Sequence, residues 1–565
     1  MADASVEDGW RLIQRFATLN RESGSPDEHA AADYVAAELD RLGVPFEMFQ
    51  PELYLSLPRA ASVALGPGGP PIQGKPPAFA GTSPPDGVTA GAVHVPAARA
   101  KDVTDIFSDH RAETDVRGKI VVSEGYAMPA AVLRFERAGA VAQVYINPGK
   151  RVHWGICTSI WGTPGDADLP RKPGTPVAAI SRPDGDRLLR HLQTGAPVTV
   201  RTTLEEGWYR CKLPVASIPG ASDDFLLVHG HYDSWDVGIG DNAVGDATLL
   251  DIARILYRHR KKLRRSVRVA WWPGHSMGRY AGSTWYADRF ALDLRKHCVA
   301  AVNIDSPGCW KATAYQEVMW MAEADALCRG AIQDATGVTP HRLRPIRAGD
   351  YSFNQLGLTS FFMLLSNIPQ EERERLGFYP VGGCGGNIAW HTEDDLLPVA
   401  DRDNLLRDLK VYLTAFARVL NAAVLPLDYR AAARELAEAL AAYQKEGGEL
   451  VDLAPALLEL GALERALKQL YRSAVGRPSP RRAERLNHAL KELARLLVPI
   501  NYAAGERFSH DPALPLGAIP RLSGIGRLKG CPEQTRPFLL AAIRREINTV
   551  ANALYEATRV AAATL

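Results

Sequence analysis

The sequence predicts an α/β fold with a mostly parallel central sheet, a β-rich inserted region and a C-terminal helical bundle. Between about 206 and 425, apolar strands alternate with helices, which is the pattern of a mostly parallel sheet covered on both faces. From 51 to about 205, prolines and glycines are dense and the expected strands are short. A chain of 565 residues is too long for one ordinary hydrophobic core, so we expect several units.

The chain divides at the changes in this pattern. Residues 7–42 are helical, and the main helix begins after the Ser-Pro-Asp-Glu start signal and ends at Gly43. Inside the inserted region, "VRGKIVVSEGY", "PAAVLRFERAGA" and "VAQVYINP" predict a strand, a helix and a strand. We therefore expect an α/β domain formed by 1–50 with 206–425, an inserted domain over 51–205, and helices over 426–565.

The sequence of the α/β part predicts strands that alternate with helices. "FLLVHGHYD", "SVRVAWWPG" and "CVAAVNIDSPG" are apolar strands. The helices between them are "NAVGDATLLDIARILYRHRKKL" and "STWYADRFALDLRKH". In open sheets of this kind, ligands bind at the carboxyl ends of the strands. The C-terminal part predicts a bundle of about four helices, interrupted by "RPSPRRAERLNHAL" and by a loop.

Composition excludes several classes of protein. Hydrophobic residues make up 46% and charged residues 23%, as in a soluble globular protein. A net charge of +2 gives no electrostatic case for a nucleic-acid or membrane partner, and no long apolar run predicts a membrane span. The acidic start is not that of a signal peptide. Seven widely spaced cysteines argue against a disulfide framework, so we expect a cytoplasmic protein.

Imidazole and acidic side chains follow the predicted strand ends. His231 and Asp233 come directly after one strand, Asp241 opens the next helix, Asp305 follows another strand, and His391 lies in a later loop. Each residue alone is more often structural, but together they should converge on one edge of the sheet. Imidazole and carboxylate ligands suit zinc and similar divalent ions. Asp241 could bridge two ions, and Asp233 could hold the imidazole of His231.

With these residues in place, the chain resembles the co-catalytic zinc aminopeptidase family, and within it the glutamate-carboxypeptidase and transferrin-receptor branch. The matching stretches are "LLVHGHYDSWDVGIGDNAVGDATLLDIARIL", "AGSTWYADRF", "AAVNIDSPG", "AGDYSFNQLGLTSFFM" and "AWHTEDDLL". The inserted region resembles a protease-associated domain, and the helical tail resembles the dimerisation domain of that branch. The resemblance covers nearly the whole chain and implies a phosphorylase/hydrolase-like zinc-peptidase domain.

The resemblance also implies roles for the site residues. His231 and Asp305 would hold one metal ion, Asp241 would bridge to a second, and His391 would bind the second. Asp233 would be the supporting carboxylate. The implied cofactor is a divalent metal, zinc, as one or two ions. The implied assembly is a homodimer through the C-terminal helices.

The chain departs from the family after the "RVAWW" strand. The family carries two adjacent glutamates there, the general base and the remaining metal ligand, whereas this chain has His275 and Ser276, with one extra residue before "AGST". An imidazole titrates near neutral pH, so His275 could remain the base. It could instead coordinate the second metal ion, but it cannot easily do both. Ser276 is a poor zinc ligand, so we expect one tightly held ion or a pair with altered geometry.

Three functions remain open from the sequence. The first is a metal-dependent hydrolase of an amide bond, either peptide-like or in a small non-peptide molecule. The second is a non-catalytic binding or assembly protein, and the third is a different metal-assisted reaction on the same scaffold. The predicted ligands favour catalysis, because clustered carboxylates repel one another without a cation.

Four aromatic residues near the predicted ligands are candidates for substrate binding. Trp235 and Trp390 could wall an apolar pocket or simply pack in the core. Tyr232 and Tyr351 could donate a hydrogen bond to an oxyanion, although buried tyrosines usually satisfy local acceptors.

Arginines bear on the substrate question. The branch grips acidic side chains with arginines after the strand that corresponds to "LTSFFMLLSNIP", and this stretch holds none. A preference for acidic residues is therefore not supported. Arg344 and Arg347 lie earlier and either face the cleft or are solvated.

Overall fold

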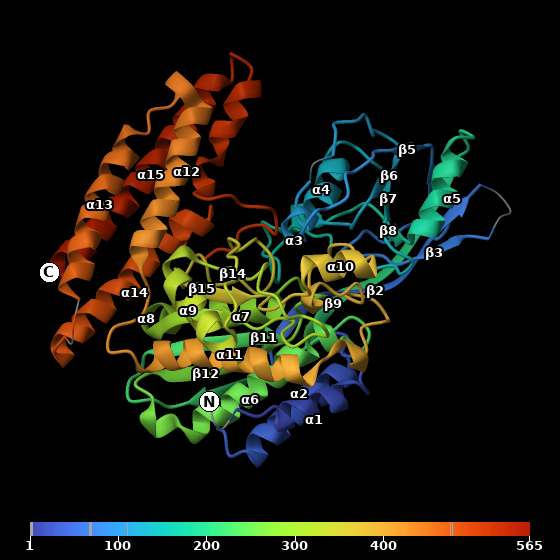
Figure 1. Cartoon of the computed structure of the whole chain (residues 1–565). Coiled ribbons are helices and arrows are strands. Elements are labelled where there is room, and N and C mark those ends of the chain that lie inside the picture. Colours follow the sequence, from blue (N-terminus) through green and yellow to red (C-terminus); the bar gives the residue numbers. More distant parts are fainter. Residues whose placement is uncertain (1–3, 67–69, 110, 475, 477, 565) are drawn as a thin grey trace.

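The computed structural model describes residues 4–66, 70–109, 111–474, 476 and 478–564. Figure 1 shows an α/β body, a lobe built from the inserted residues at the upper right, and long C-terminal helices at the upper left. The predicted α/β class with a central sheet is confirmed. Among the described residues, no helix combines the length and apolar character needed to cross a bilayer.

The central sheet is mixed, whereas the sequence predicts a mostly parallel one. Its strands lie in the order β1 (Phe46–Phe49), β10 (Leu213–Ile218), β12 (Ser266–Trp272), β11 (Phe225–His231), β13 (Cys298–Asn303), β15 (Ser360–Met363) and β14 (Met319–Trp320). The middle strands β12, β11, β13 and β15 run parallel. Each outer strand runs antiparallel to its inner neighbour: β1 to β10, β10 to β12, and β14 to β15.

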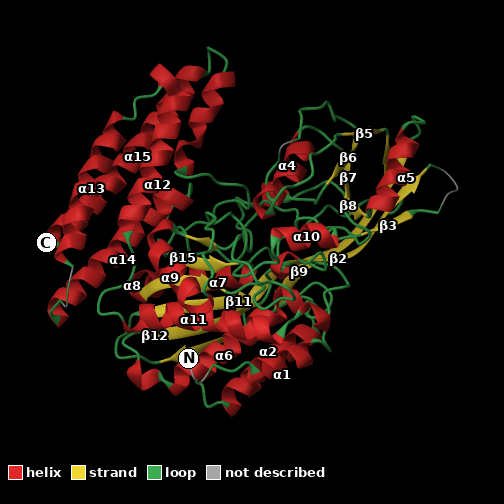
Figure 2. Ribbon diagram, in the orientation of Figure 1, coloured by secondary structure: helices red, strands yellow, loops and turns green. Residues whose placement is uncertain are grey.

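Helices cover both faces of this sheet (Figure 2). One face packs against α1 (Glu7–Phe16), α2 (Pro26–Arg41), α6 (Val244–Arg258), α9 (Asp325–Thr336) and α11 (Arg402–Asn421). The other packs against α7 (Ala281–Arg289) and α8 (Ala291–His297). Side chains alternate along β11, so Leu226 and Val228 enter the first core and Phe225 and Leu227 the second. Burial on both faces explains why the strand is apolar throughout.

The inserted residues form two small sheets. A long antiparallel pair, β2 (Glu52–Leu65) and β9 (Val198–Arg210), carries the chain away from the body and back, and β3 (Ile72–Gly74) and β4 (Val88–Ala90) flank it. The second sheet is parallel, with β5 (Ala92–His94), β6 (Ile120–Glu124), β7 (Ala142–Ile146) and β8 (Val177–Ile180). Its helices are α3 (Val103–Ile106), α4 (Pro129–Arg137) and α5 (Arg182–Leu192).

The C-terminal part is helical. Its long helices are α12 (Tyr429–Gly447), α13 (Ala454–Ser473), α14 (Pro480–Tyr502) and α15 (Arg536–Ala563), and a short helix, α10 (Gln370–Leu376), lies in the body. Arg495 of α14 donates hydrogen bonds to the carbonyl oxygens of Gly357 and Cys298, which attaches the helices to the body.

Candidate active site

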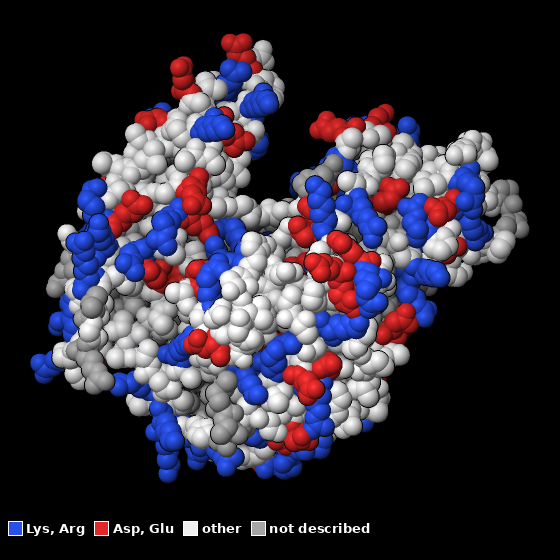
Figure 3. All heavy atoms as spheres, viewed as in Figure 1, with Lys and Arg blue, Asp and Glu red and all other residues white. Residues whose placement is uncertain are grey.

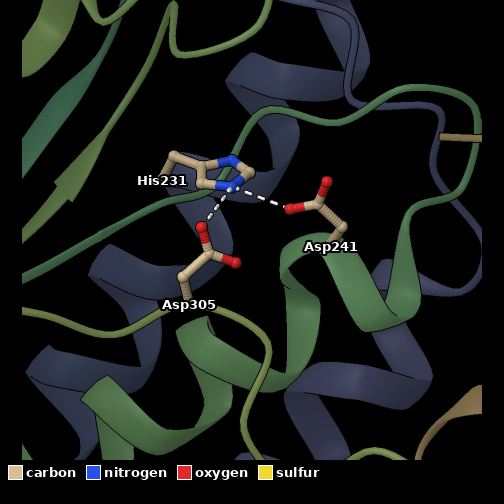
Figure 4. A group of neighbouring side chains, drawn as sticks. All are labelled: His231, Asp241 and Asp305. Atoms are coloured by element: carbon tan, nitrogen blue, oxygen red, sulfur yellow. Dashed lines mark hydrogen bonds and ion pairs between the residues drawn. The ribbon is translucent and has the colours of Figure 1, made fainter. Parts of the chain in front are cut away.

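Three predicted ligands meet at one edge of the central sheet. His231 ends β11, Asp305 follows the neighbouring parallel strand β13, and Asp241 lies in the loop before α6. One ligand atom of each lies within 4.8 Å of the others. The Nε2 atom of His231 is 3.0 Å from Oδ1 of Asp241 and 4.0 Å from Oδ2 of Asp305. Figure 4 shows both carboxylates turned toward this nitrogen.

His391 reaches the same cluster from a distant loop. Its Nε2 lies 2.9 Å from Oδ2 of Asp241, so the two oxygens of this carboxylate face two different imidazoles. The Nδ1 atoms of His231 and His391 are hydrogen-bonded to the carbonyl oxygens of Asp233 and Trp154. A carbonyl oxygen only accepts, so each Nδ1 carries the hydrogen and each Nε2 is directed at Asp241.

Burial and charge act in opposite directions on these groups. Burial alone would raise the pKa of Asp241, but hydrogen bonds from His231 and His391 outweigh it and hold that pKa well below its usual value. Burial, together with the charge of Asp241, raises the pKa of Asp305. The pKa of His231 is raised although burial opposes its charge, because Asp233 and Asp241 accept its hydrogen bonds. Two imidazoles and two carboxylates gathered around Asp241 are a donor set that fits a divalent ion such as zinc.

The loop between His231 and Asp241 is held by two buried side chains. The Arg21 guanidinium donates to the carbonyl oxygens of Tyr232, Val237 and Gly238. The carboxylate of Asp395 accepts the backbone N–H of Gly240 at 2.6 Å and that of Asp241 at 3.0 Å. Burial raises the pKa of Asp395 to about 7. These contacts fix where the carboxylate of Asp241 lies.

Asp233 supports the site rather than facing the cavity. Its carboxylate accepts the backbone N–H groups of His275, at 3.0 Å, and Ser276, at 2.9 Å. It also accepts the hydroxyl of Ser23 at 2.7 Å, and its Oδ1 is 3.7 Å from Nδ1 of His231. The same carboxylate therefore holds both the imidazole of His231 and the turn that carries His275.

That turn joins β12 to α7 and brings His275 against the cluster. Its ring stacks on that of His231, with centroids 3.7 Å apart and planes 16° apart. Its Nδ1 lies 2.8 Å from Oδ2 of Asp350, whose Oδ1 accepts the Ser283 hydroxyl at 2.6 Å. Burial would raise the pKa of Asp350, but His275 holds it below its usual value. Within the described part of the chain, no group is hydrogen-bonded to Nε2 of His275.

A cavity of about 590 Å³, including space open to solvent, lies over the cluster. The inserted region supplies part of its apolar wall through Phe107, Met128 and Ile156. The remaining wall comes from the body: Asp241, His275, Arg279, Tyr280, Asp305, Ile346, Ala348, Gly349, Met363, Leu364, Gly382, Trp390 and His391. Polar groups at one end and apolar walls elsewhere are typical of a small-molecule site.

Comparison with known proteins agrees with this arrangement. Residues 215–413, which contain all four clustered side chains, match the model of peptidase family M28. The match to peptidase family M28 covers this segment of the chain. The M28 segment starts in β10 and ends in α11, so it spans the central sheet from β10 onward.

Curated relatives extend the match beyond the M28 segment. The chain is 27% identical over 366 residues to "Probable glutamate carboxypeptidase VP8" of Zea mays, covering 54% of this chain and 50% of the relative. It is 27% identical over 296 residues to "Leucine aminopeptidase 2" of Arthroderma otae, covering 51% and 55%. The chain thus spans about half the length of these relatives. The predicted resemblance to the zinc aminopeptidase family is confirmed.

Solved structures show the same fold. A zinc aminopeptidase from Bacillus subtilis is 18% identical, with a TM-score of 0.55 over 74% of this chain and 96% of its own. An aminopeptidase from Aneurinibacillus sp. strain AM-1 is 19% identical, with a TM-score of 0.53 over 74% and 95%. At this level of identity, the likeness establishes the fold alone.

The predicted substrate-binding residues are distributed unevenly in the M28 fold. Trp390 lines the cavity and stacks on His391 with ring centroids 3.8 Å apart. Trp235 does not line it, and instead stacks on Trp154 with centroids 5.2 Å apart while its edge meets His391. The Trp235 ring therefore packs against His391 without lining the cavity.

One predicted oxyanion donor is corrected. Tyr232 is fully buried in the core, and its hydroxyl donates to the carbonyl oxygen of Lys212. Tyr351 does not itself line the cavity, but it is buried in an apolar cluster with the cavity-lining side chains of Tyr280 and Met363. The sequence does not reveal these placements. Both tyrosines stand next to site residues, but neighbouring side chains along an extended segment point in opposite directions.

Sequence reasoning missed three residues of the site: Asp350, Asp395 and Arg279. Asp350 stands next to Tyr351, and Asp395 stands near His391. The sequence does not reveal which group a carboxylate in a loop will bind, so neither aspartate was predicted. Arg279 lies in the turn with the extra residue, and that irregularity was the available signal. Arg344 and Arg347, by contrast, bind Glu435 and the carbonyl oxygens of Tyr351 and Asp511.

Proposed function

We propose that the protein is a metal-dependent hydrolase of an amide bond, peptide-like or in a small molecule. The observation that carries the proposal is the buried group of His231, Asp241 and Asp305, with His391 on the second oxygen of Asp241. Its place at the strand ends of an M28 fold supports the same conclusion. A divalent ion held there would polarise the amide carbonyl and lower the pKa of water.

The ligand set we propose is His231, Asp241, Asp305 and His391. Both histidines are held at Nδ1 by carbonyl oxygens, which leaves Nε2 for an ion. Asp241 offers one oxygen to each side and is the group suited to a bridging position. Zinc is favoured because imidazole and carboxylate donors suit it and because a solved neighbour of this fold is a zinc aminopeptidase.

We propose that His275 is the general base. Asp350 fixes its Nδ1, so the ring has one orientation, and its Nε2 is the atom that would take a proton from the attacking water. The alternative, in which His275 is a metal ligand, is less favoured because, within the described residues, no contact joins its Nε2 to Asp241 or Asp305, whereas His391 contacts Asp241.

A non-catalytic binding protein is the second candidate. It is favoured by the replacement of the two family glutamates by His275 and Ser276. The buried hydrogen bond between His275 and Asp350 argues for catalysis, because a packed scaffold does not need a buried polar pair of this kind for its stability.

Two further proposals concern the flanking regions. The inserted region would act as a protease-associated domain that closes one side of the cavity, which the wall residues Phe107, Met128 and Ile156 support. The C-terminal helices would join two copies of the chain, which the exposed side chains of Leu458 on α13 and Phe538 on α15 support. Light scattering of Phe538→Asp tests this, and an unchanged molar mass contradicts it.

The proposed activity is tested by metal content and hydrolysis measured on the same sample. The purified protein should contain a divalent ion, and should cleave at least one member of a panel of aminoacyl anilides, dipeptides and small amides. Chelation should remove both ion and activity, and added zinc should restore both. Hydrolysis that survives complete removal of the ion, or a folded protein that never binds one, contradicts the proposal.

A further inference from the structure

One buried arginine in the cavity, Arg279, lies over the ring of Tyr280 but has no hydrogen-bonded or ion-paired partner among the described residues. Arg279 is 4% exposed and lines the cavity together with Asp241, His275 and Asp305. Within the described residues, no carboxylate or carbonyl oxygen accepts a hydrogen bond from its guanidinium, and its buried Nε has no partner. We propose that Arg279 binds a carboxylate of the substrate, so that the protein acts on amides that carry a free carboxylate near the scissile bond. This inference rests on the proposed amide hydrolysis.

The other buried arginines show how unusual this is. Each of them is hydrogen-bonded: Arg21, Arg265, Arg347 and Arg495 to backbone carbonyl oxygens, and Arg373 to Glu317. A buried charge without a partner is destabilising by several kcal/mol, which is why folded proteins pair such groups. Arg279 is the exception, and it is also the buried arginine that faces the reaction site.

The backbone holds Arg279 in place at a conformational cost. Arg279 and Tyr280 have φ angles of 48° and 71°, in the left-handed region that residues other than glycine rarely adopt. Such a conformation is strained and is retained mainly at functional sites. Two backbone hydrogen bonds fix this turn. The N–H of Tyr280 donates to the carbonyl oxygen of His275, and the N–H of Gly162 donates to the carbonyl oxygen of Arg279. The guanidinium itself is left for a ligand.

The surroundings of Arg279 select a carboxylate. A guanidinium presents a planar fork of N–H donors that matches the two oxygens of a carboxylate. Among the described residues that line the cavity, Arg279 is the one lysine or arginine, so it is the one guanidinium or ammonium group offered to a ligand. One charge balances a carboxylate, whereas a phosphate dianion would be left half compensated in an apolar surrounding.

The place of Arg279 limits the shape of the substrate. It lies where the turn meets the inserted region, because Gly162 donates to its backbone and Ile156 lines the same cavity. The predicted metal-ligating residues lie in the same small cavity as Arg279. The carboxylate and the scissile amide therefore belong to one compact substrate molecule. An N-acyl amino acid or a short peptide with a free C-terminus fits, with an apolar group against Met128 and Leu364.

A matched pair of substrates tests the proposal. The zinc-loaded protein should hydrolyse N-benzoyl-L-leucine at least 10-fold more efficiently than its neutral C-terminal N-methylamide. Arg279→Gln should lower kcat/KM for the acid by about 10- to 100-fold, mainly through KM, because one charge-assisted hydrogen-bonded pair is lost. It should leave the methylamide within about twofold, and Arg279→Lys should fall between. Arg289→Gln, which removes an exposed arginine ten residues later, is the control.

A binding measurement separates this proposal from the proposed hydrolysis. Hydrocinnamate has a carboxylate and no amide, so its binding to the zinc-loaded protein can be measured by calorimetry even if no amide is cleaved. We expect the wild-type protein to bind it at least 10-fold more tightly than Arg279→Gln does. Equal binding by the two proteins, equal affinity for the neutral methylamide of hydrocinnamate, or tighter binding of inorganic phosphate would overturn the proposal.

Discussion

The two sides of the cavity differ in how they are built. On the strand side, His231 and Asp305 lie at the ends of neighbouring parallel strands and Asp241 lies in the loop before α6. Their metal-ligating atoms face one another. On the turn side, His275 stands where the sequence comparison expects a glutamate, and Arg279 follows on a backbone with left-handed residues. The two sides can therefore be varied separately, the strand side for the binding of an ion and the turn side for the proposed proton transfer and substrate contact.

The largest effect is expected on the strand side. Asp241→Asn removes the carboxylate that faces both His231 and His391, so bound metal should be lost and activity should fall by about 10³-fold or more. Metal analysis and kcat/KM measure the two losses. Asp394→Asn, which removes an exposed carboxylate close to His391 in the sequence, should change neither. A variant of Asp241 that retains its full metal content would show that this side is not the ligand set.

A smaller effect is expected on the turn side. His275→Gln should lower kcat by about 10²- to 10⁴-fold, the usual contribution of a general base, while metal content stays unchanged. Asp350→Asn removes only the group that orients His275, so a loss of about 10- to 100-fold is expected.

The same variants decide between the two roles of His275. Loss of metal from His275→Gln would show that the imidazole is a ligand, and the two sides of the cavity would then act as one metal site. Wild-type kcat in both variants would place the proton transfer elsewhere.

The smallest effect concerns the contact between the inserted region and the loop of His391. The ring of His153 is bonded at Nδ1 to the Trp390 carbonyl oxygen, at 2.6 Å, and at Nε2 to the Tyr379 hydroxyl, at 2.8 Å. Burial lowers its pKa to about 3, against about 6.5 when unfolded. The unfolded chain therefore binds a proton that the folded chain does not, and the free energy of unfolding should fall as the pH drops from 6.5 toward 3.

This loss is at most about 1.4 kcal/mol per pH unit for one group. His153→Phe should be less stable at pH 7, because the Trp390 carbonyl loses its partner, but its stability should depend less on pH below 6.5. Thermal unfolding midpoints at pH 7, 6 and 5 measure both effects. His229, whose pKa burial lowers to about 4, offers a second buried histidine for comparison. A pH dependence identical to that of the wild type would show that His153 is not neutral in the folded protein.

The sequence was sufficient for the α/β class and for the residues that cluster at the sheet edge, since strand ends share an edge whatever the loops do. The sequence was insufficient where the position of a side chain depends on a partner far away along the chain. Asp350 becomes part of the site only through His275, and the Tyr232 hydroxyl is bound by the carbonyl oxygen of Lys212. The antiparallel outer strands were not predicted, because apolar patterning does not reveal strand direction.

The contacts of Arg21 have a practical consequence. Arg21 lies between α1 and α2, near the N-terminus, yet it donates hydrogen bonds to three carbonyl oxygens in the loop that joins His231 to Asp241. The stretch that matches the family begins about two hundred positions later. A fragment cut to the borders of that match would leave those oxygens bare and the loop unsupported. The smallest piece able to form this centre therefore starts near the beginning of the chain, and expression trials should be planned accordingly.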